Sequence, residues 1–559
     1  MKYTLLMTLL APALLAGCNL EKKEEPFQAR HIRAGYDAGQ VCQQLRQGWQ
    51  EDGIAIPASQ VSCHYLTVPL DYDKEWVQIK ETKWEKRSAA RADSSLFADN
   101  SPRFPSWSDK PVQPHVKQET RTVKGNTLDV FYLHYRASGD YRGTLFYNPG
   151  GPTSATPDLG LLLDMLRSAN PAILEHYDIV TLDPRGAGYS ALGHELRSCL
   201  LTDKQGVRPD MSPAQLAQLF ASRDKGALPA LQSGADQGKA FSTALLERCD
   251  EPLRLHAPHL GSRVVVEDME RLRQHLGRER ITPITFSYGT RLAALYAARY
   301  PSHVANLVVD SPMSPAESRY PAIFRGDAEN ANRILAWRFG DQALQHSMAV
   351  TRQIRDNGRY VDNLGNVLDR DRWEAVLGDA ISGSQRDDQL AFWQQDDAGP
   401  LLARLADQAD DNPYQELQEM PFFSAIHCTD NSEPYDWQTL DPEDAAFQGA
   451  GALLLAKSFN TCADWPYPRQ PIASYGAGEI KLPDDARALV LGAEYDPNTP
   501  FAGARQMQAA FGSAARLVQV AQSNQHGQLS SSRCAQAALS TLLLGDGAGL
   551  PAEQRCLAD

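Results

Sequence analysis

The chain has 559 residues, too many for one compact core, and its 42% hydrophobic and 22% charged residues are typical of a globular protein. A net charge of −14 argues against nucleic acid as a partner, because phosphate binding needs a basic surface. We therefore expect one large domain that carries a sizeable insertion.

The amino terminus predicts export. Lys2 precedes an apolar stretch at 5–15, which is too short to cross a bilayer as a helix and is typical of a signal peptide. The stretch leads into Leu-Ala-Gly-Cys at 15–18, which resembles a bacterial lipobox. An ordinary signal peptide with an incidental cysteine is the alternative.

A lipobox assigns a role to each part of this end of the chain. Residues 1–17 would be a lipoprotein signal peptide, Cys18 would carry the lipid that anchors the protein to a membrane, and residues 18–35 would form a tether. By resemblance to Gram-negative lipoproteins, Asn19 favours the outer membrane of the bacterial cell envelope, facing the periplasm or the exterior.

Eight further cysteines are consistent with export, because an oxidising compartment permits disulfides. Sequence alone does not choose among their possible pairings. A zinc site is the alternative, and it is disfavoured because there is no close C-x-x-C pair. Neither a metal nor an organic cofactor is implied. The simplest pairing joins nearest neighbours: Cys42–Cys63, Cys199–Cys249, Cys428–Cys462 and Cys534–Cys556.

Strands and helices alternate along most of the remaining chain, which predicts an α/β fold with a mostly parallel sheet and helices on both faces. An apolar segment at 61–72 predicts a strand and a turn, and the charged, Ser- and Pro-rich residues 73–126 predict a surface insertion. Residues 128–135 alternate as a strand does, with every second side chain from Leu128 on one face. Further strands are expected at 144–147, 177–182, 281–286, 304–309, 488–491 and 517–520, and helices at 264–276, 290–300, 501–511 and 534–544.

Between 313 and 483 this alternation stops. The segment is rich in Trp and Gln and mostly helical in pattern, and it lies between two predicted core strands. We expect it to form an inserted cap over the strand ends, where enzymes built on such sheets bind ligands. Residues 36–312 and 484–559 would then form the core.

Ser287 has the position of a nucleophile in this pattern. It lies in Thr-Phe-Ser-Tyr-Gly at 285–289, between a predicted strand and a predicted helix. The Gly-x-Ser-x-Gly elbow of α/β-hydrolases holds its serine on such a strained turn. Gly289 keeps one of the two glycines, whereas the branched Cβ of Thr285 crowds the turn. A plain strand–helix turn whose serine caps the helix is the alternative.

Two later turns supply the other members of a catalytic triad. Asp496 lies at the tip of the turn after the 488–491 strand, and His526 follows the next strand. Ser, Asp, His is the order along the chain in α/β-hydrolases, in which the acid orients the base that takes the serine proton. Asp310, at the end of the strand after the elbow helix, is the alternative acid.

The turn Asn-Pro-Gly-Gly-Pro at 148–152 predicts part of an oxyanion hole. In this fold one N–H comes from the residue after the nucleophile, here Tyr288, and another from a loop at the exit of an earlier strand. Because Pro152 has no N–H, Gly151 is the natural second donor. A plain tight turn is the alternative.

These motifs belong to an ordered set that resembles the tripeptidyl-aminopeptidase-like branch of the proline iminopeptidase family. The set covers most of residues 60 to 556. It consists of Leu-Thr-Val-Pro-Leu-Asp-Tyr at 66–72, Asn-Pro-Gly-Gly-Pro at 148–152, Asp-Pro-Arg-Gly-Ala-Gly-Tyr-Ser at 183–190, Ser-Tyr-Gly-Thr at 287–290, paired Cys segments at 425–430 and 462–466, Asp-Pro-Asn-Thr-Pro at 496–500, and His-Gly at 526–527.

The resemblance implies the α/β-hydrolase fold, the same triad, and a serine peptidase that releases short peptides or single residues from the free N-terminus of peptide substrates. The chain departs from the family at Thr285, at Thr-Ser-Ala in 153–155 where a Gly-rich continuation is usual, and in the extra residues 73–126.

A peptidase that needs a free N-terminus must bind a cationic amine. Asp430 and Glu433, late in the predicted cap, are candidates by location, and ordinary surface charges are the alternative reading. An esterase that acts on small acyl esters could use the same triad. A non-catalytic binding protein on a hydrolase scaffold is a third hypothesis, suggested by Thr285 and by Pro283 in a central strand.

Overall fold

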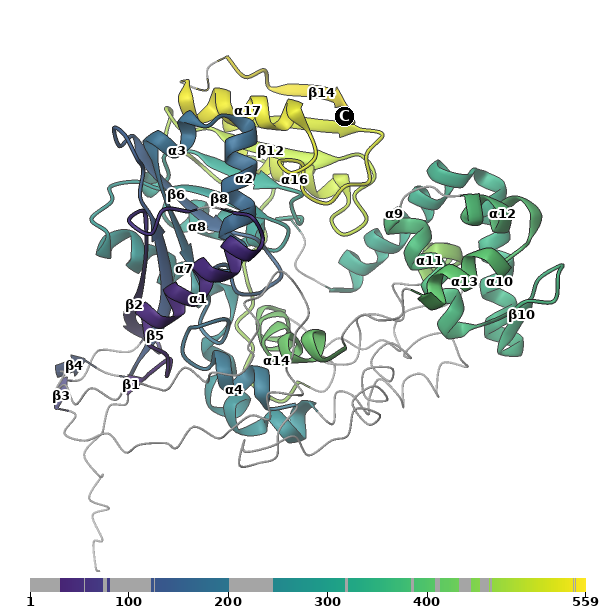
Figure 1. Ribbon diagram of the computed structural model, residues 1–559, viewed down its shortest axis with the longest axis horizontal. Helices are drawn as coiled ribbons and strands as arrows, with labels where there is room; N and C mark the ends of the chain where they lie inside the picture. Colours follow the sequence, from purple (N-terminus) through teal and green to yellow (C-terminus); the bar gives the residue numbers. More distant parts are fainter. Residues whose placement is uncertain are drawn as a thin grey trace, which may run out of the picture.

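The computed structural model describes most of the chain (Figure 1). Cys18, Glu433, the predicted signal peptide and most of the predicted tether and insertion lie outside the described residues. None of the described helices is long and apolar enough to cross a membrane. The described residues are 31–54, 56–73, 78–80, 122–124, 126–200, 245–316, 320–383, 387–407, 413–431, 444–452, 462, 465–545, 547 and 549–559.

A mostly parallel sheet forms the centre of the core, as predicted. Its order is β1-β5-β7-β6-β8-β9-β12-β13-β14, and β2 pairs with β5 at one end. Every neighbouring pair from β7 to β14 is parallel, whereas β5 is antiparallel to both β2 and β7. The strands are β1 (His31–Ile32), β2 (Val61–Pro69), β5 (Thr127–Tyr135), β6 (Gly143–Asn148), β7 (Tyr177–Leu182), β8 (Thr282–Phe286), β9 (Leu307–Asp310), β12 (Ala488–Ala493), β13 (Ala515–Ala521) and β14 (Glu553–Leu557).

Helices cover both faces of this sheet. Both sides of β5 are therefore buried, although its side chains alternate as the sequence predicts: Leu128 and Val130 enter one apolar cluster, and Phe131 and Leu133 enter the other. One face packs against α1 (Ala38–Glu51), α2 (Leu159–Ala169), α3 (Ala172–His176) and α17 (Arg533–Leu544), and the other against α4 (Gly193–Ser198), α7 (Ser262–His275), α8 (Gly289–Arg299) and α16 (Phe501–Phe511).

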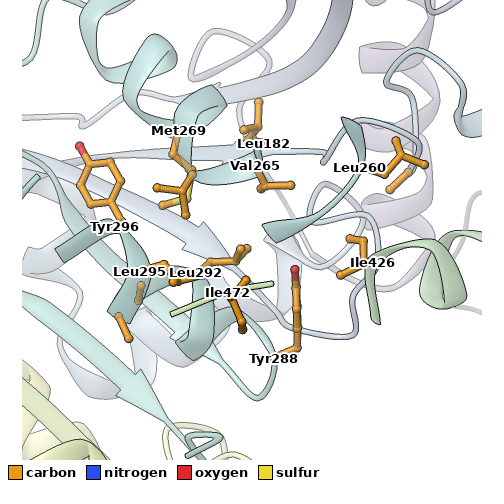
Figure 2. Packing of buried hydrophobic residues seen from close by; sticks show 14 of the residues in the cluster. Leu182, Leu260, Val265, Met269, Tyr288, Leu292, Leu295, Tyr296, Ile426 and Ile472 are labelled. Carbon is orange, nitrogen blue, oxygen red and sulfur yellow. The ribbon is translucent and has the colours of Figure 1, made fainter. Parts of the chain in front are cut away.

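Between β9 and β12 the chain forms a helical lobe to one side of the core, followed by a helix that packs on the core. The lobe has an apolar cluster of its own, centred on Trp373, Phe392 and Trp393. The later helix, α14 (Pro413–Asp430), packs against α4, and its Ile426 belongs to the same apolar cluster as Tyr288 and the buried side chains of α7 and α8 (Figure 2). The lobe consists of α9 (Tyr320–Phe339), α10 (Asp341–Asn357), the paired strands β10 (Arg359–Val361) and β11 (Val367–Asp369), α11 (Arg370–Ser382), α12 (Asp387–Gln395) and α13 (Gly399–Asp407).

Four disulfides join nearest-neighbour cysteines, and all four predicted pairs are confirmed. Cys42–Cys63 ties α1 to β2, and Cys534–Cys556 ties α17 to the edge strand β14. Within the predicted insertion, the described parts are two short strands, β3 (Gln78–Lys80) and β4 (Thr122–Lys124), which pair antiparallel.

Candidate active site

Ser287 lies on a sharp turn between β8 and α8. Its φ of 49° is in the left-handed region, which a residue with a side chain seldom adopts, and its N–H donates to the carbonyl of Asp310 at 3.1 Å. A Cβ built on Gly289 would come within 2.4 Å of Asn148 Oδ1, so the close approach of β6 requires glycine there. This is the backbone strain expected at a functional turn.

Thr285 and Pro283 are the two unusual residues of the strand that leads to Ser287, and the fold accommodates both. The Thr285 side chain is buried, and its hydroxyl donates to the carbonyl of Val308 at 3.2 Å. Pro283 lies in β8, which pairs with β6 on one side and β9 on the other. Neither residue prevents the strand from delivering Ser287 to the edge of the sheet.

His526 binds the carboxylate of Asp496. Its Nδ1 is 3.0 Å from both carboxylate oxygens. The same carboxylate accepts the N–H groups of Asn498 and Thr499 at 2.9 Å and the Thr499 hydroxyl at 3.1 Å. Burial alone would lower the pKa of His526, but the hydrogen bond and the charge of Asp496 outweigh it, so this pKa is raised.

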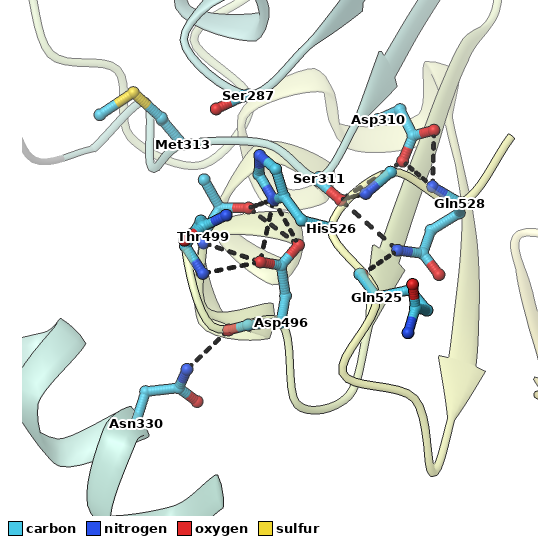
Figure 3. Close-up of polar contacts among 12 residues, drawn as sticks. Ser287, Asp310, Ser311, Met313, Asn330, Asp496, Thr499, Gln525, His526 and Gln528 are labelled. Carbon is cyan, nitrogen blue, oxygen red and sulfur yellow. Dashed lines mark hydrogen bonds and ion pairs between the residues drawn. The ribbon is translucent and has the colours of Figure 1, made fainter. Parts of the chain in front are cut away.

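The three predicted catalytic side chains come together at the carboxyl edge of the sheet. In Figure 3 the imidazole of His526 lies between Asp496 and Ser287. No hydrogen bond joins Ser287 to His526 among the described residues. Catalytic hydrogen bonds are often long without substrate and tighten only when it binds.

Asp310, the alternative acid, has other partners. Its buried carboxylate accepts the N–H groups of Gln528 and Leu529 at 2.8 Å, and the next residue, Ser311, accepts the N–H of Gly527 through its hydroxyl at 2.8 Å. His526 Nδ1 is taken by Asp496 instead. The geometry therefore favours Asp496 as the acid.

The two predicted oxyanion donors flank the nucleophile. Asn148 Oδ1 accepts the N–H of Gly150 at 3.0 Å, and a Cβ on Gly150 would lie 2.9 Å from the Cβ of Ser287 and 3.3 Å from the nitrogen of Tyr288. The N–H groups of Gly151 and Tyr288 have no acceptor among the described residues, so both remain available to a ligand.

Asp183 holds the chain that follows Gly151. Its carboxylate accepts the Ser154 hydroxyl at 2.7 Å and the N–H groups of Ala155 and Thr156 at 3.0 Å. Burial raises the pKa of Asp183. The Ser and Ala that replace a Gly-rich continuation are thus tied to the start of the 183–190 turn.

Of the two predicted amine-binding carboxylates, only Asp430 belongs to the described residues. Glu433 lies outside the described residues. Asp430 is buried, with 3% exposure, and its two oxygens accept the N–H and the hydroxyl of Ser262 at 2.8 and 2.5 Å. The Ser262 hydroxyl also contacts the Tyr288 hydroxyl at 2.6 Å. Burial raises the pKa of Asp430 to about 6. Asp430 is thus neither a surface charge nor an unoccupied carboxylate.

Asp327, on α9, is a carboxyl group that the sequence pattern did not single out. It makes no hydrogen bond or ion pair to any described residue. Burial, together with the charge of Asp496, raises its pKa to about 7. Nothing in the sequence of α9 distinguishes it from its acidic neighbours, because its significance comes from the packing of α9 against the Asp496 turn.

Helix α9 contacts that turn at three points. The Asn330 side chain donates to the carbonyl of Asp496 at 2.7 Å, Arg333 donates to the carbonyl of Glu494, and Trp337 stacks on Tyr495 with 4.1 Å between ring centroids. Asp327 lies three residues before Asn330, so the two share a face of the helix. No group of side chains suited to hold a metal ion occurs in the described part of the chain.

Comparisons with known proteins identify a family and several relatives. A family described as "alpha/beta hydrolase fold" matches residues 143–531. A tripeptidyl aminopeptidase of Streptomyces coelicolor is 25% identical over 84% of this chain and 77% of its own length. In Mycobacterium tuberculosis, the serine protease Hip1 is 25% identical over 67% of this chain and 74% of its own, and a carboxylesterase B is 26% identical over 67% and 73%. A solved proline iminopeptidase of Mycobacterium smegmatis is 13% identical, with a TM-score of 0.35, over 75% of this chain and 96% of its own.

Proposed function

Since the chain belongs to the α/β-hydrolase fold family and is a serine hydrolase, we propose that it is a peptidase that releases short peptides or single residues from the free N-terminus of peptide substrates. The observation that carries the proposal is His526, bonded to Asp496 at 3.0 Å on one side and facing Ser287 on the other. Relatives named tripeptidyl aminopeptidase and serine protease support a peptide as the substrate.

The proposed reaction is acyl transfer. Ser287 Oγ attacks the carbonyl carbon while His526 takes the serine proton, and the N–H groups of Gly151 and Tyr288 stabilise the oxyanion. Asp496 holds the imidazole and stabilises its positive charge. His526 then gives the proton to the leaving amine, and water attacks the acyl-enzyme with His526 again as the base, which releases the product and restores Ser287.

The substrate amine needs a negative partner near this site. Both oxygens of Asp430 are engaged by Ser262, whereas Asp327 has no partner among the described residues. A partly buried carboxyl group without a partner carries a desolvation cost, and an ammonium ion would relieve that cost. We therefore assign the amine-binding role first to Asp327, and Glu433 stays a prediction.

Two measurements in sequence test the proposal. A fluorophosphonate should label Ser287 in the wild-type protein and not in Ser287→Ala. A panel of aminoacyl and peptidyl amides, each with a free and an acetylated N-terminus, should then be cleaved only in the free form. Absence of labelling would favour the non-catalytic scaffold instead.

An esterase is the second candidate, because one relative is named carboxylesterase B. It would use the same serine, acid and base. Rapid turnover of small acyl esters, with no cleavage of any amide in the panel, would favour it over the peptidase.

We further propose that Cys18 carries a lipid that anchors the protein to the bacterial outer membrane. The lipobox at 15–18 supports this, and the four disulfides fit an oxidising compartment. Labelled fatty acid should be incorporated into the wild-type protein and not into Cys18→Ala, and the wild type should fractionate with outer membranes.

A further inference from the structure

Asp310 lies at the carboxyl end of β9, between β8 and β12 in the middle of the sheet. Its side chain is completely buried. The proposed mechanism gives it no role, although its charge acts on His526.

Asp310 contacts Ser287 and the second and third residues after His526. Its carbonyl accepts the N–H of Ser287 at 3.1 Å. Its carboxylate accepts the N–H of Gln528 at 2.8 Å from each oxygen and the N–H of Leu529 at 2.8 Å. The nucleophile and the segment just after the base are therefore fixed to the same strand end.

The histidine loop is held at three consecutive peptide groups. Gly527 donates to the Ser311 hydroxyl at 2.8 Å, and the next two N–H groups reach Asp310 (Figure 3). Asp496 orients the imidazole ring, but it does not fix the backbone that carries the ring. That backbone is positioned by the end of β9.

We propose that Asp310 is a positioning residue, which fixes His526 relative to Ser287 and supplies a second negative charge to the imidazolium that forms during the reaction. The proposal rests on the acyl-transfer function described above. It assigns to Asp310 a role distinct from that of Asp496, because Asp310 acts through the loop backbone and through its charge, not through a hydrogen bond to the ring.

The electrostatic part of the proposal follows from burial and charge. Burial raises the pKa of Asp310 to about 6, and the N–H groups of Gln528 and Leu529 act against that rise because they stabilise the ionised carboxylate. The acidic groups that act on His526 are Asp496 and Asp310, and both raise its pKa. A buried charge near a developing charge is little screened by solvent.

The test compares Asp310→Asn with Ser311→Ala in the full-length protein. Asparagine keeps the shape but removes the charge and turns an NH₂ group toward a backbone donor, whereas Ser311→Ala removes a neighbouring loop hydrogen bond and no charge. For each variant, kcat, KM and the pH profile of kcat/KM are measured on a peptide amide and on a small acyl ester.

We expect Asp310→Asn to lower kcat about 10–100-fold on both substrates with little change in KM, because a small misplacement of a catalytic group is costly. The acidic limb of its pH profile of kcat/KM should move to lower pH, since removing a negative charge lowers the pKa of His526. Ser311→Ala should lower kcat less and leave the limb in place. Wild-type kcat in Asp310→Asn, or an unmoved limb, would overturn the proposal.

A second variant, Asp310→Glu, covers the case in which the asparagine variant does not fold. It keeps the charge, so it should lower kcat and leave the acidic limb where it is. Failure of both variants to fold would make Asp310 a determinant of folding and would also overturn the proposal. If wild-type protein is not labelled by a fluorophosphonate, the proposed function fails first, independently of Asp310.

Discussion

The side chain of Asn330, on helix α9 of the lobe, donates a hydrogen bond of 2.7 Å to the backbone carbonyl of Asp496. The lobe thereby contacts Asp496, the predicted acid, whose carboxylate binds the predicted base His526. With the Trp337–Tyr495 stack beside it, this bond makes the position of the acid turn depend on how α9 packs.

Replacing Asn330 by Ala should destabilise the protein and impair catalysis. The buried carbonyl of Asp496 would lose its partner, which costs about 1–3 kcal/mol, and the acid turn would be less well fixed. Chemical denaturation measures the first effect and kcat the second. Asn332→Ala is the matched control, since Asn332 lies on the same helix but bonds Ala446 and Gly451 instead of the acid turn. Equal losses of kcat in both variants would contradict the coupling.

Loss of a triad member should abolish turnover without unfolding the protein. We expect Ser287→Ala to have no measurable activity and Asp496→Asn to lose about 10⁴-fold in kcat, because the histidine then takes the wrong tautomer. Circular dichroism should show unchanged folds. Wild-type-like activity in Ser287→Ala would remove the basis of the proposed mechanism.

The pH dependence of activity should reflect the ionisation of His526. The base acts in its neutral form, and its pKa is raised above the usual value of about 6.5, mainly by Asp496 against the opposing effect of burial. Activity should therefore rise with pH through a midpoint above about 6.5. Asp496→Asn should move its residual activity toward lower pH, because the charge that stabilises the imidazolium is gone. A midpoint well below that of free histidine in the wild type would contradict the assigned base.

Asp327→Asn should discriminate between substrates with and without a free amine. If Asp327 binds the substrate ammonium, its removal should raise KM for free peptides by about 10–100-fold, the equivalent of a charged hydrogen bond, and leave acyl esters unaffected. Glu329→Gln is the control: Glu329 is exposed on the same helix and pairs with Arg325. Equal effects on esters and peptides would show that Asp327 does not recognise the amine.

Asp327→Asn should also change the thermal stability of the protein, and only by raising it. The pKa of Asp327 is raised to about 7 in the folded protein, so its ionised form disfavours folding, a cost that is absent below the unfolded pKa and fully present above about 7. Asp327→Asn should therefore raise Tm at alkaline pH and leave it nearly unchanged in acid. A pH-independent change in Tm would indicate ordinary repacking.

The sequence predicted that Ser287, Asp496 and His526 would lie together, because parallel strands deliver their carboxyl ends to one edge of a sheet. Ser287, Asp496 and His526 each follow a predicted strand, and their order along the chain matches the required connectivity. The elbow glycine at 289 and the nearest-neighbour disulfides could likewise be predicted from the sequence, since local motifs and chain separation determine them.

Other features depend on packing between distant segments and could not be read from the pattern. The sequence placed Asp430 among substrate-binding groups, but the start of α7 buries it. It gave no reason to choose Asp327 or Asn330 within α9, because their importance comes from the acid turn lying opposite. The edge strand β14 is short and exposed on alternate residues, too weak a pattern to identify without the strand it pairs with.

The residues of the candidate site are attached to two different parts of the fold, the central sheet and the helical lobe. Ser287 and the loop after His526 are both hydrogen-bonded to the end of β9, in the centre of the sheet. Asp496 is also hydrogen-bonded to α9 of the lobe. A change in how α9 packs would therefore act first on Asp496 and, through the bond to Nδ1, on the ring of His526. The packing of the lobe thus bears on the strength of the base, whereas the backbone of Ser287 and of the loop after His526 is held by the sheet.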